Sequence, residues 1–269
     1  MIVDAHTHIH DDPDGLGNGY DASLANLLRS MDKAGVEKAL IMAEAVDVPY
    51  IKRISNETVA HACSQYPDRL IGFASVHPMG KNCMTELRIA LDDLGLRGLK
   101  LHPRFQGVPA DDPRCVELAA STAERNLPIA VDAFLWKPTP LRIQLPFHID
   151  TLCKQVPNAR VIMNHAGGFH FLDALAVLIA NDNVWLEFST SLPYFINTPF
   201  KDQFLFVLKQ AGPQRVIFGS DHPQKDMAKA LQTSREALQE TGFSSEDLDW
   251  AMGRTFLQVL SPQSGENHA

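Results

Sequence analysis

The sequence predicts an α/β fold of the (β/α)8 barrel (TIM barrel) class, slightly distorted from the ideal. Eight short apolar, often β-branched runs alternate with longer amphipathic segments, and successive runs start 24 to 36 residues apart. That spacing is about one strand-helix unit. Nearly continuous apolar runs are typical of parallel strands buried on both faces. The expected strands are Ile2–Ala5, Lys38–Met42, Leu70–Ser75, Gly98–Leu101, Pro128–Val131, Arg160–Asn164, Val184–Phe188 and Arg215–Phe218.

Helix signals occupy the intervals between these strands. Ala22–Ala34 ends at Gly35, a residue that commonly terminates helices. Asp111–Arg125 carries two acidic residues and a proline in its first turn, which suits a helix N-terminus. Ser244 with Asp247 resembles a capping box for a last helix over Glu246–Leu260. The other expected helices are Tyr50–Tyr66, Asn82–Leu94, Asp150–Gln155, Phe171–Ala180, Asp202–Gln210 and Lys225–Glu240.

The length and composition suit one barrel domain over residues 1–260, followed by a polar tail over residues 261–269. The chain has 269 residues, 45% of them hydrophobic, which is enough for one large core. No composition break marks a linker. An open doubly wound sheet is the alternative, but it normally offers a glycine-rich turn after its first strand. Here that turn holds His6-Thr7-His8.

The charge balance excludes several classes of partner. A net charge of -8 argues against a general nucleic-acid or anionic-membrane binder. No apolar run is long enough for a membrane span, and no secretory signal is present.

The four cysteines are scattered, so we expect buried reduced thiols and a cytoplasmic location. The expected partner is a small-molecule substrate, and the oligomeric state is open, with a homodimer as one option.

Ionisable residues gather where the predicted strands end. In a (β/α)8 barrel the active site lies at the C-terminal ends of the strands. Nearly every predicted strand delivers a metal-competent or acid-base side chain to this one rim, which a chance scatter would not favour. These residues are His6, His8, Glu44, His77, Lys100, His102, Asp132, His165, Glu187, Ser189, Asp221 and His222.

The pair His6 and His8 is the most informative of these features. Side chains alternate along a strand, so residues two apart point the same way. Two imidazoles on one face can bind a single divalent metal. The alternative is that both are ordinary polar residues where a strand enters a loop. Their place on the functional rim, with Asp221 beside them, favours the metal site.

Other rim residues also have two interpretations. Lys100 stands among apolar neighbours and contacts either a substrate or a buried carboxylate such as Glu44 or Glu187. His102 faces a ligand or caps the loop before Pro103. Asp221 serves the site or caps the next helix.

Two aromatic loops are candidates for the substrate pocket. Trp136 follows the fifth predicted strand and Tyr194 follows the seventh. Apolar walls with a few cations, such as Arg104, suit a ring or alkyl chain bearing a carboxylate. The alternative is that these aromatic residues form loop packing or a dimer face.

Four motifs in this order resemble the amidohydrolase superfamily. They begin with the stretches from Asp4 to His8 and from Gly98 to Pro103. They continue with Asn164 to Gly168 and Phe218 to Pro223. The chain is most similar to the branch of metal-dependent hydrolases that includes aminocarboxymuconate-semialdehyde decarboxylase, related aromatic-acid decarboxylases and lactonases. The resemblance spans almost the whole chain.

The resemblance implies a set of roles. His6 and His8 would bind one divalent metal, zinc or alternatively manganese, with Asp221 as ligand or nearby base. His165 would stand close to the activated water. The family usually supplies a further histidine after the fifth strand, where this chain has Asp132. Asp132 is then either a substitute ligand, since carboxylates suit zinc or manganese, or a sign that the metal is weak or absent.

The expected function is that of a metal-dependent hydrolase of a small ester, lactone or amide. The substrate would carry a carboxylate, and Asp221 would take a proton from the metal-activated water. His165 would stabilise the oxyanion or orient the water. The alternatives are a non-oxidative decarboxylase, and a metal-free lactonase or ligand-binding barrel. The expected substrate-binding residues are Lys100, His102, Arg104, Trp136, Tyr194 and His222.

Overall fold

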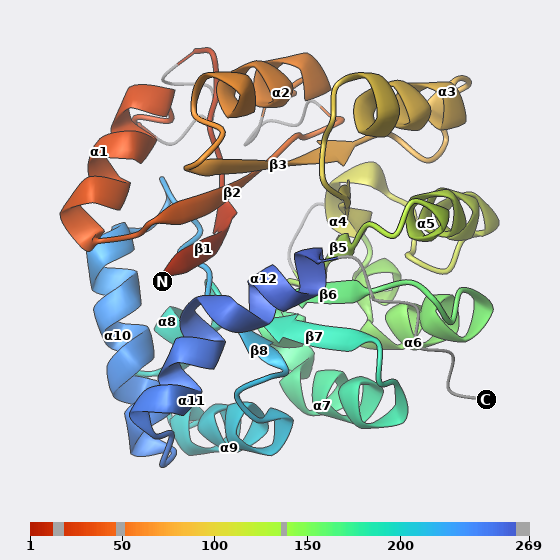
Figure 1. Ribbon diagram of the computed structural model, residues 1–269. Coiled ribbons are helices and arrows are strands. Elements are labelled where there is room, and N and C mark those ends of the chain that lie inside the picture. Colours follow the sequence, from red (N-terminus) through yellow and green to blue (C-terminus); the bar gives the residue numbers. More distant parts are fainter. Residues whose placement is uncertain (13–18, 47–51, 136–138, 262–269) are drawn as a thin grey trace.

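A computed structural model describes residues 1–12, 19–46, 52–135 and 139–261 of the chain (Figure 1). Within these ranges, eight parallel strands form one sheet in the order β1 to β8, each paired with its sequence neighbours. The strands are β1 (Val3–Thr7), β2 (Lys38–Met42), β3 (Leu70–Ser75), β4 (Leu99–Leu101), β5 (Ile129–Asp132), β6 (Val161–Asn164), β7 (Val184–Glu187) and β8 (Val216–Ile217). The predicted (β/α)8 fold is confirmed.

Backbone hydrogen bonds between β1 and the β8 segment close the sheet into a barrel. The backbone N–H of Ala5 donates to the carbonyl of Phe218 at 3.0 Å, and the N–H of Asp221 donates to the carbonyl of His6 at 2.9 Å. The N–H of His8 donates to the carbonyl of His222 at 2.8 Å. These bonds bring the first and last rim motifs side by side.

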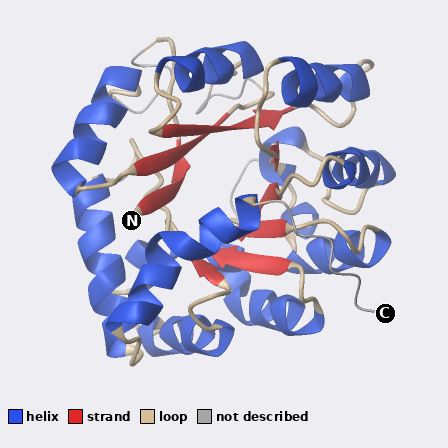
Figure 2. Cartoon of the chain, viewed as in Figure 1, coloured by secondary structure: helices blue, strands red, loops and turns tan. Residues whose placement is uncertain are grey.

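Helices surround the barrel and cover the outer face of the strands (Figure 2). They are α1 (Leu24–Ala34), α2 (Asn56–Gln65), α3 (Cys83–Arg88), α4 (Pro103–Gln106), α5 (Pro113–Glu124), α6 (Pro146–Gln155), α7 (Phe171–Ala180), α8 (Ser191–Phe195), α9 (Lys201–Ala211), α10 (Met227–Glu240), α11 (Ser245–Asp249) and α12 (Thr255–Leu260). A π-helical turn extends α3 over Ile89–Asp93, and another joins α11 to α12 over Trp250–Arg254. A 3₁₀ helix spans Leu141–Gln144.

Local caps explain several helix boundaries. Gly35 has a φ of 69° and ends α1, a conformation that glycine adopts without strain. Ser244 and Asp247 form the expected capping box, so α11 begins at Ser245.

Two predicted helix starts need correction. The sixth helix begins at Pro146 rather than Asp150, because proline is favoured at the first helical position. The second begins at Asn56, where the Ser55 side chain accepts a hydrogen bond from the N–H of Thr58. The first two residues of that predicted helix, Tyr50 and Ile51, lie outside the described residues. The short helices α4 and α8 were not expected.

The core has two layers, one between the barrel and its helices and one inside the barrel. Phe73, Ile162 and Ile217 belong to the inner layer, which continues onto Phe256 and Val259 of α12. Figure 1 shows α12 crossing the barrel, where it covers the end opposite the rim motifs. The polar site therefore occupies the other end.

None of the described helices has both the length and the apolar character that a membrane span requires. All four cysteines are free thiols, with Cys63 partly exposed and Cys83, Cys115 and Cys153 buried.

Candidate active site

Three donor atoms converge where β1 meets the segment after β8. The Nε2 atoms of His6 and His8 lie 3.8 Å and 3.6 Å from Oδ1 of Asp221. All three residues are buried, with His6 only 2% exposed. The structure thus brings together three of the four predicted metal ligands. These three residues are called the three-donor group below.

The ring of His6 is held from its other side by Glu187, the last residue of β7. Nδ1 of His6 lies 2.7 Å from Oε2 of Glu187, and both side chains are buried. Burial lowers the pKa of His6 to about 4, against the opposing attraction of Glu187. Burial alone would raise the pKa of Glu187, but His6, His165 and the Ser189 backbone lower it to about 2. The pair is therefore a neutral imidazole beside an ionised carboxylate.

Asp221 is also held in an ionised state. Its second oxygen, Oδ2, accepts a hydrogen bond from the hydroxyl of Thr190. Burial alone would raise the pKa of Asp221, but the facing imidazoles of His8, His6 and His165 hold it well below its usual range. Asp221, Thr190 and His165 all have a positive φ, at 64°, 54° and 60°. Such backbone strain is common at functional sites.

The three-donor group fits a divalent metal. Its separations are too long for hydrogen bonds and close to the roughly 3.3 Å that separates two ligands of one zinc ion. Two imidazole nitrogens and a carboxylate are also the donors of catalytic zinc sites.

A second set of donor atoms, from His6, His165 and Glu187, lies equally close together. There, however, Oε2 of Glu187 accepts from Asn164 Nδ2 at 3.0 Å and from the N–H of His165 at 3.4 Å. Because these donors already surround the oxygen, the three-donor group is the better of the two candidate metal sites.

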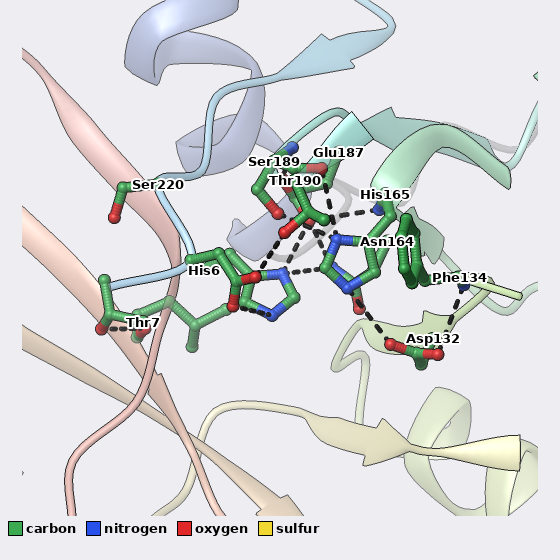
Figure 3. A network of polar contacts seen from close by, with 12 residues as sticks. His6, Thr7, Asp132, Phe134, Asn164, His165, Glu187, Ser189, Thr190 and Ser220 are labelled. Carbon is green, nitrogen blue, oxygen red and sulfur yellow. Dashed lines mark hydrogen bonds and ion pairs between the residues drawn. The ribbon is translucent and has the colours of Figure 1, made fainter. Parts of the chain in front are cut away.

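His165 lies between His6 and Asp132 (Figure 3). Its ring centre is 4.7 Å from that of His6, and its Nε2 is 3.1 Å from Oδ2 of Asp132. Its Nδ1 faces the hydroxyl of Ser189 at 3.1 Å. Burial would lower the pKa of His165, but Asp132 and the other nearby carboxylates raise it above its ordinary value.

Asp132 lies apart from the three-donor group, in a second set of buried polar residues. Its Oδ2 is 3.6 Å from Nε2 of His102 and 3.7 Å from a terminal nitrogen of Arg104. His102 Nε2 is in turn 3.9 Å from Glu44. We call Glu44, His102, Arg104 and Asp132 the Asp132 cluster. Burial would raise the pKa of Asp132, but His102, Arg104 and His165 hold it well below its usual range.

Three buried atoms of the Asp132 cluster have no hydrogen-bond partner among the described residues. They are Oε1 of Glu44, Nδ1 of His102 and Nε of Arg104. Burial lowers the pKa of His102 well below its ordinary value, so the ring is neutral. Burial also raises the pKa of Glu44 to about 8, against the attraction of Lys100. The guanidinium of Arg104 stacks over Phe105 with its carbon 4.4 Å from the ring centre.

The remaining predicted residues lie in separate surroundings. Lys100 is 1% exposed, and its Nζ donates to Oδ1 of Asn164 at 2.7 Å. Tyr194 is half exposed on α8, against the rings of Phe169 and Phe195. His222 is buried, and burial, together with the nearby His8, lowers its pKa to about 4. Trp136 lies outside the described residues.

Glu187 was predicted as a rim residue and a possible partner of Lys100, but its direct contact with His6 was not expected. The sequence indicates a partner for Glu187, because this acidic residue ends the apolar run Val184–Glu187. An acidic side chain is costly to bury there without a partner. Gly219 was missed as well. A Cβ atom on Gly219 would lie 2.5 Å from Oε1 of Glu187 and 2.7 Å from Cβ of His6, so only glycine lets these two side chains meet.

A barrel with one histidine on its first strand, a second just after that strand and an aspartate after its eighth, all at the mouth, defines a class of metal-site (β/α)8 enzymes. The amidohydrolase family model matches residues 3–255, and the chain therefore belongs to the amidohydrolase family. It is an enzyme of a superfamily that is usually metal-dependent, and the three-donor group could bind such a metal.

Solved structures share the fold over almost the whole chain. An uncharacterized TIM-barrel protein from Bordetella bronchiseptica is similar with a TM-score of 0.80 and 19% identity, over 96% of this chain and 98% of that one. The 5-carboxyvanillate decarboxylase from Sphingomonas paucimobilis has a TM-score of 0.72 and 14% identity, with the same coverage.

A probable 2-pyrone-4,6-dicarboxylic acid hydrolase from Acinetobacter baumannii, with citric acid bound, has a TM-score of 0.68 and 18% identity. The match covers 96% of this chain and 98% of that one. No curated protein matches the chain significantly by sequence. At such low identity these likenesses establish the fold, and both a hydrolase and a decarboxylase share it.

Proposed function

We propose that this protein is a metal-dependent hydrolase of a small, carboxylate-bearing ester, lactone or amide. The observation that carries the proposal is the three-donor group, in which His6, His8 and Asp221 converge at the barrel mouth. Zinc suits two imidazoles and a carboxylate, and manganese is the alternative. When bound there, the metal would polarise a substrate oxygen and lower the pKa of a water molecule.

Asp221 is the proposed general base. It is ionised, its Oδ1 faces His6 and His8, and Thr190 holds its Oδ2. A carboxylate held in this way can accept a proton from the attacking water and return it to the leaving group.

His165 would stabilise negative charge on the substrate. Asp132 and Ser189 hold its two ring nitrogens, and its raised pKa favours the imidazolium form. A fixed positive charge facing the oxygen of a carbonyl under attack stabilises the developing oxyanion.

Arg104 is the proposed partner of the substrate carboxylate. Its Nε has no partner within the described residues, and its separation from Asp132 leaves the guanidinium weakly engaged. Arginine presents a planar fork that matches a carboxylate. The neighbouring rings of Phe105 and Phe134 supply an apolar wall beside it.

Metal analysis and substrate screening test this proposal. Protein purified without chelators should contain about one zinc or manganese ion per chain. It should hydrolyse carboxylate-bearing lactones or esters faster than their neutral analogues. A chelator should abolish the activity, and added metal should restore it. Absence of bound metal, together with activity that is indifferent to added zinc or manganese, would refute the proposal and favour a metal-free lactonase.

A second candidate function is non-oxidative decarboxylation of a small unsaturated or aromatic acid. Glu44 favours it, because a buried carboxyl with a pKa of about 8 is protonated at neutral pH and can deliver a proton to carbon. Release of carbon dioxide from such an acid, without cleavage of any lactone or ester, would establish this reaction instead.

A further inference from the structure

A continuous series of hydrogen bonds crosses the barrel interior from β4 to β1. Nζ of Lys100 donates to Oδ1 of Asn164 at 2.7 Å, and Nδ2 of Asn164 donates to Oε2 of Glu187 at 3.0 Å. The same Glu187 oxygen lies 2.7 Å from Nδ1 of His6. We call these four residues the buried network. Figure 3 shows its Asn164, Glu187 and His6 members.

The polarity of the buried network determines which nitrogen of His6 carries the proton. Lys100 can only donate, which orients the Asn164 amide with its oxygen toward Lys100 and its NH2 toward Glu187. Glu187 as a carboxylate can only accept, and it also receives the N–H of Ser189 on its other oxygen. The 2.7 Å contact with this carboxylate is shorter than the 3.3 Å between Nδ1 of His6 and the Asn164 NH2 group, so His6 donates from Nδ1 to Glu187. The Nε2 lone pair of His6 then faces His8 and Asp221.

We propose that Glu187, oriented by Asn164 and Lys100, is a positioning residue that fixes the tautomer and ring orientation of His6 for metal binding. The inference rests on the metal site of the proposed function. Partners that orient a metal-binding histidine typically contribute 10- to 100-fold to metal affinity.

The same geometry gives Lys100 a role other than substrate contact. The side chain is 1% exposed and its ammonium is already bonded to Asn164. An ammonium group is costly to bury, so its presence here calls for a function that offsets the cost. Holding Asn164 in one of its two amide orientations is such a function, because a flipped amide would place its oxygen against Glu187.

Metal affinity measured by competition with a chelator tests the proposal. We expect zinc affinity to fall 10- to 100-fold in Glu187→Gln and by a smaller factor in Lys100→Met, because Lys100 acts on His6 only through Asn164 and Glu187. The matched control is Thr122→Val, which removes a buried hydrogen bond to Leu118 on α5, away from the site. Wild-type zinc affinity in a folded Glu187→Gln protein would overturn the proposal, as would an equal loss in Thr122→Val.

A second measurement requires neither a folded variant nor activity. Nitrogen-15 NMR of the metal-free wild-type protein should show His6 protonated on Nδ1 and unprotonated on Nε2. Protonation on Nε2 alone would overturn the proposal. A protein with the expected tautomer and affinity losses, but with no hydrolysis of any ester, lactone or amide, would refute the proposed hydrolase while leaving the role of Glu187 intact.

Discussion

The buried network and the Asp132 cluster lie at the same barrel mouth but differ in how well their polar atoms are paired. Within the described residues, Lys100, Asn164 and Glu187 have all their side-chain polar atoms paired, and His6 leaves only Nε2, which faces Asp221, without a hydrogen bond. Three buried atoms of the cluster have no partner. A buried polar atom without a partner costs about 1–3 kcal/mol. The difference indicates that the network is built to hold the protein's own groups, while the cluster keeps hydrogen-bonding capacity for a ligand.

The largest effect should follow from removing the two proposed metal-binding histidines, one of which, His6, is positioned by the buried network. In His6→Ala/His8→Ala, two of the three donor side chains are gone, so we expect loss of bound metal. The value of kcat/KM should fall by at least about 10³, equivalent to roughly 4 kcal/mol. Metal analysis and kinetics measure both, with His170→Ala as control because His170 bonds Asp173 outside the site. Full metal content in the double variant would show that the metal is bound elsewhere.

Metal removal should destabilise the wild-type protein by a somewhat smaller amount. At a free zinc concentration 100 to 1,000 times Kd, binding stabilises the fold by about 3–4 kcal/mol. Calorimetry with and without zinc should therefore show Tm rising by several degrees. His6→Ala/His8→Ala should show no such rise, and an equal rise there would mean that zinc stabilises the fold through another site.

Changing the cluster should affect substrate binding and leave the metal in place. In Arg104→Met we expect KM for a carboxylate-bearing substrate to rise 10- to 100-fold, or about 1.4–2.7 kcal/mol. The metal content should not change, because Arg104 contacts none of the three-donor group among the interactions described. Steady-state kinetics should show no rise in KM for the neutral ester analogue. Arg114→Met on α5 is the matched control, and an equal loss for both substrates would exclude a carboxylate contact.

The last prediction concerns the pH dependence of folding. Burial raises the pKa of Glu44 from 4.5 to about 8, so the folded protein holds a proton that the unfolded chain releases above 4.5. The stability contributed by Glu44 is therefore full below about pH 4.5 and is lost as the pH rises through 8. The unfolding free energy of Glu44→Gln, compared with that of the wild type, should therefore be clearly higher at pH 9 than at pH 5. Urea denaturation at pH 5 and pH 9 measures the difference in unfolding free energy between the two proteins. An equal difference at both pH values would contradict the raised pKa of Glu44.

Most of the fold follows from local patterns in the chain. The apolar runs locate all eight strands, and β2 and β3 have the expected bounds. The errors occur where tertiary contacts or caps decide, as at Ser55 and Pro146. The short helices α4 and α8 form within loops at the rim, and the sequence of these loops has no hydrophobic periodicity that would predict a helix.

The candidate site was predictable in location but only partly in its pairings. Barrel topology places every strand end on one rim, so His6, His8 and Asp221 could be grouped from sequence alone. Which side chains meet inside the barrel depends on the stagger of strands that are distant in sequence. Asp132 pairs with Asn164 in the β5–β6 register and reaches His165, while Glu187 reaches His6. Hydrophobic periodicity carries no information on that stagger.

Gly219 limits the substitutions that the protein can accept, because it lies against both His6 and Glu187. Since a methyl group there would overlap both side chains, the position tolerates no atom beyond hydrogen. Tyr194, by contrast, is half exposed on α8 and can vary in size. A selection for activity from a library randomised at both positions should therefore return diverse side chains at 194, and glycine alone at 219.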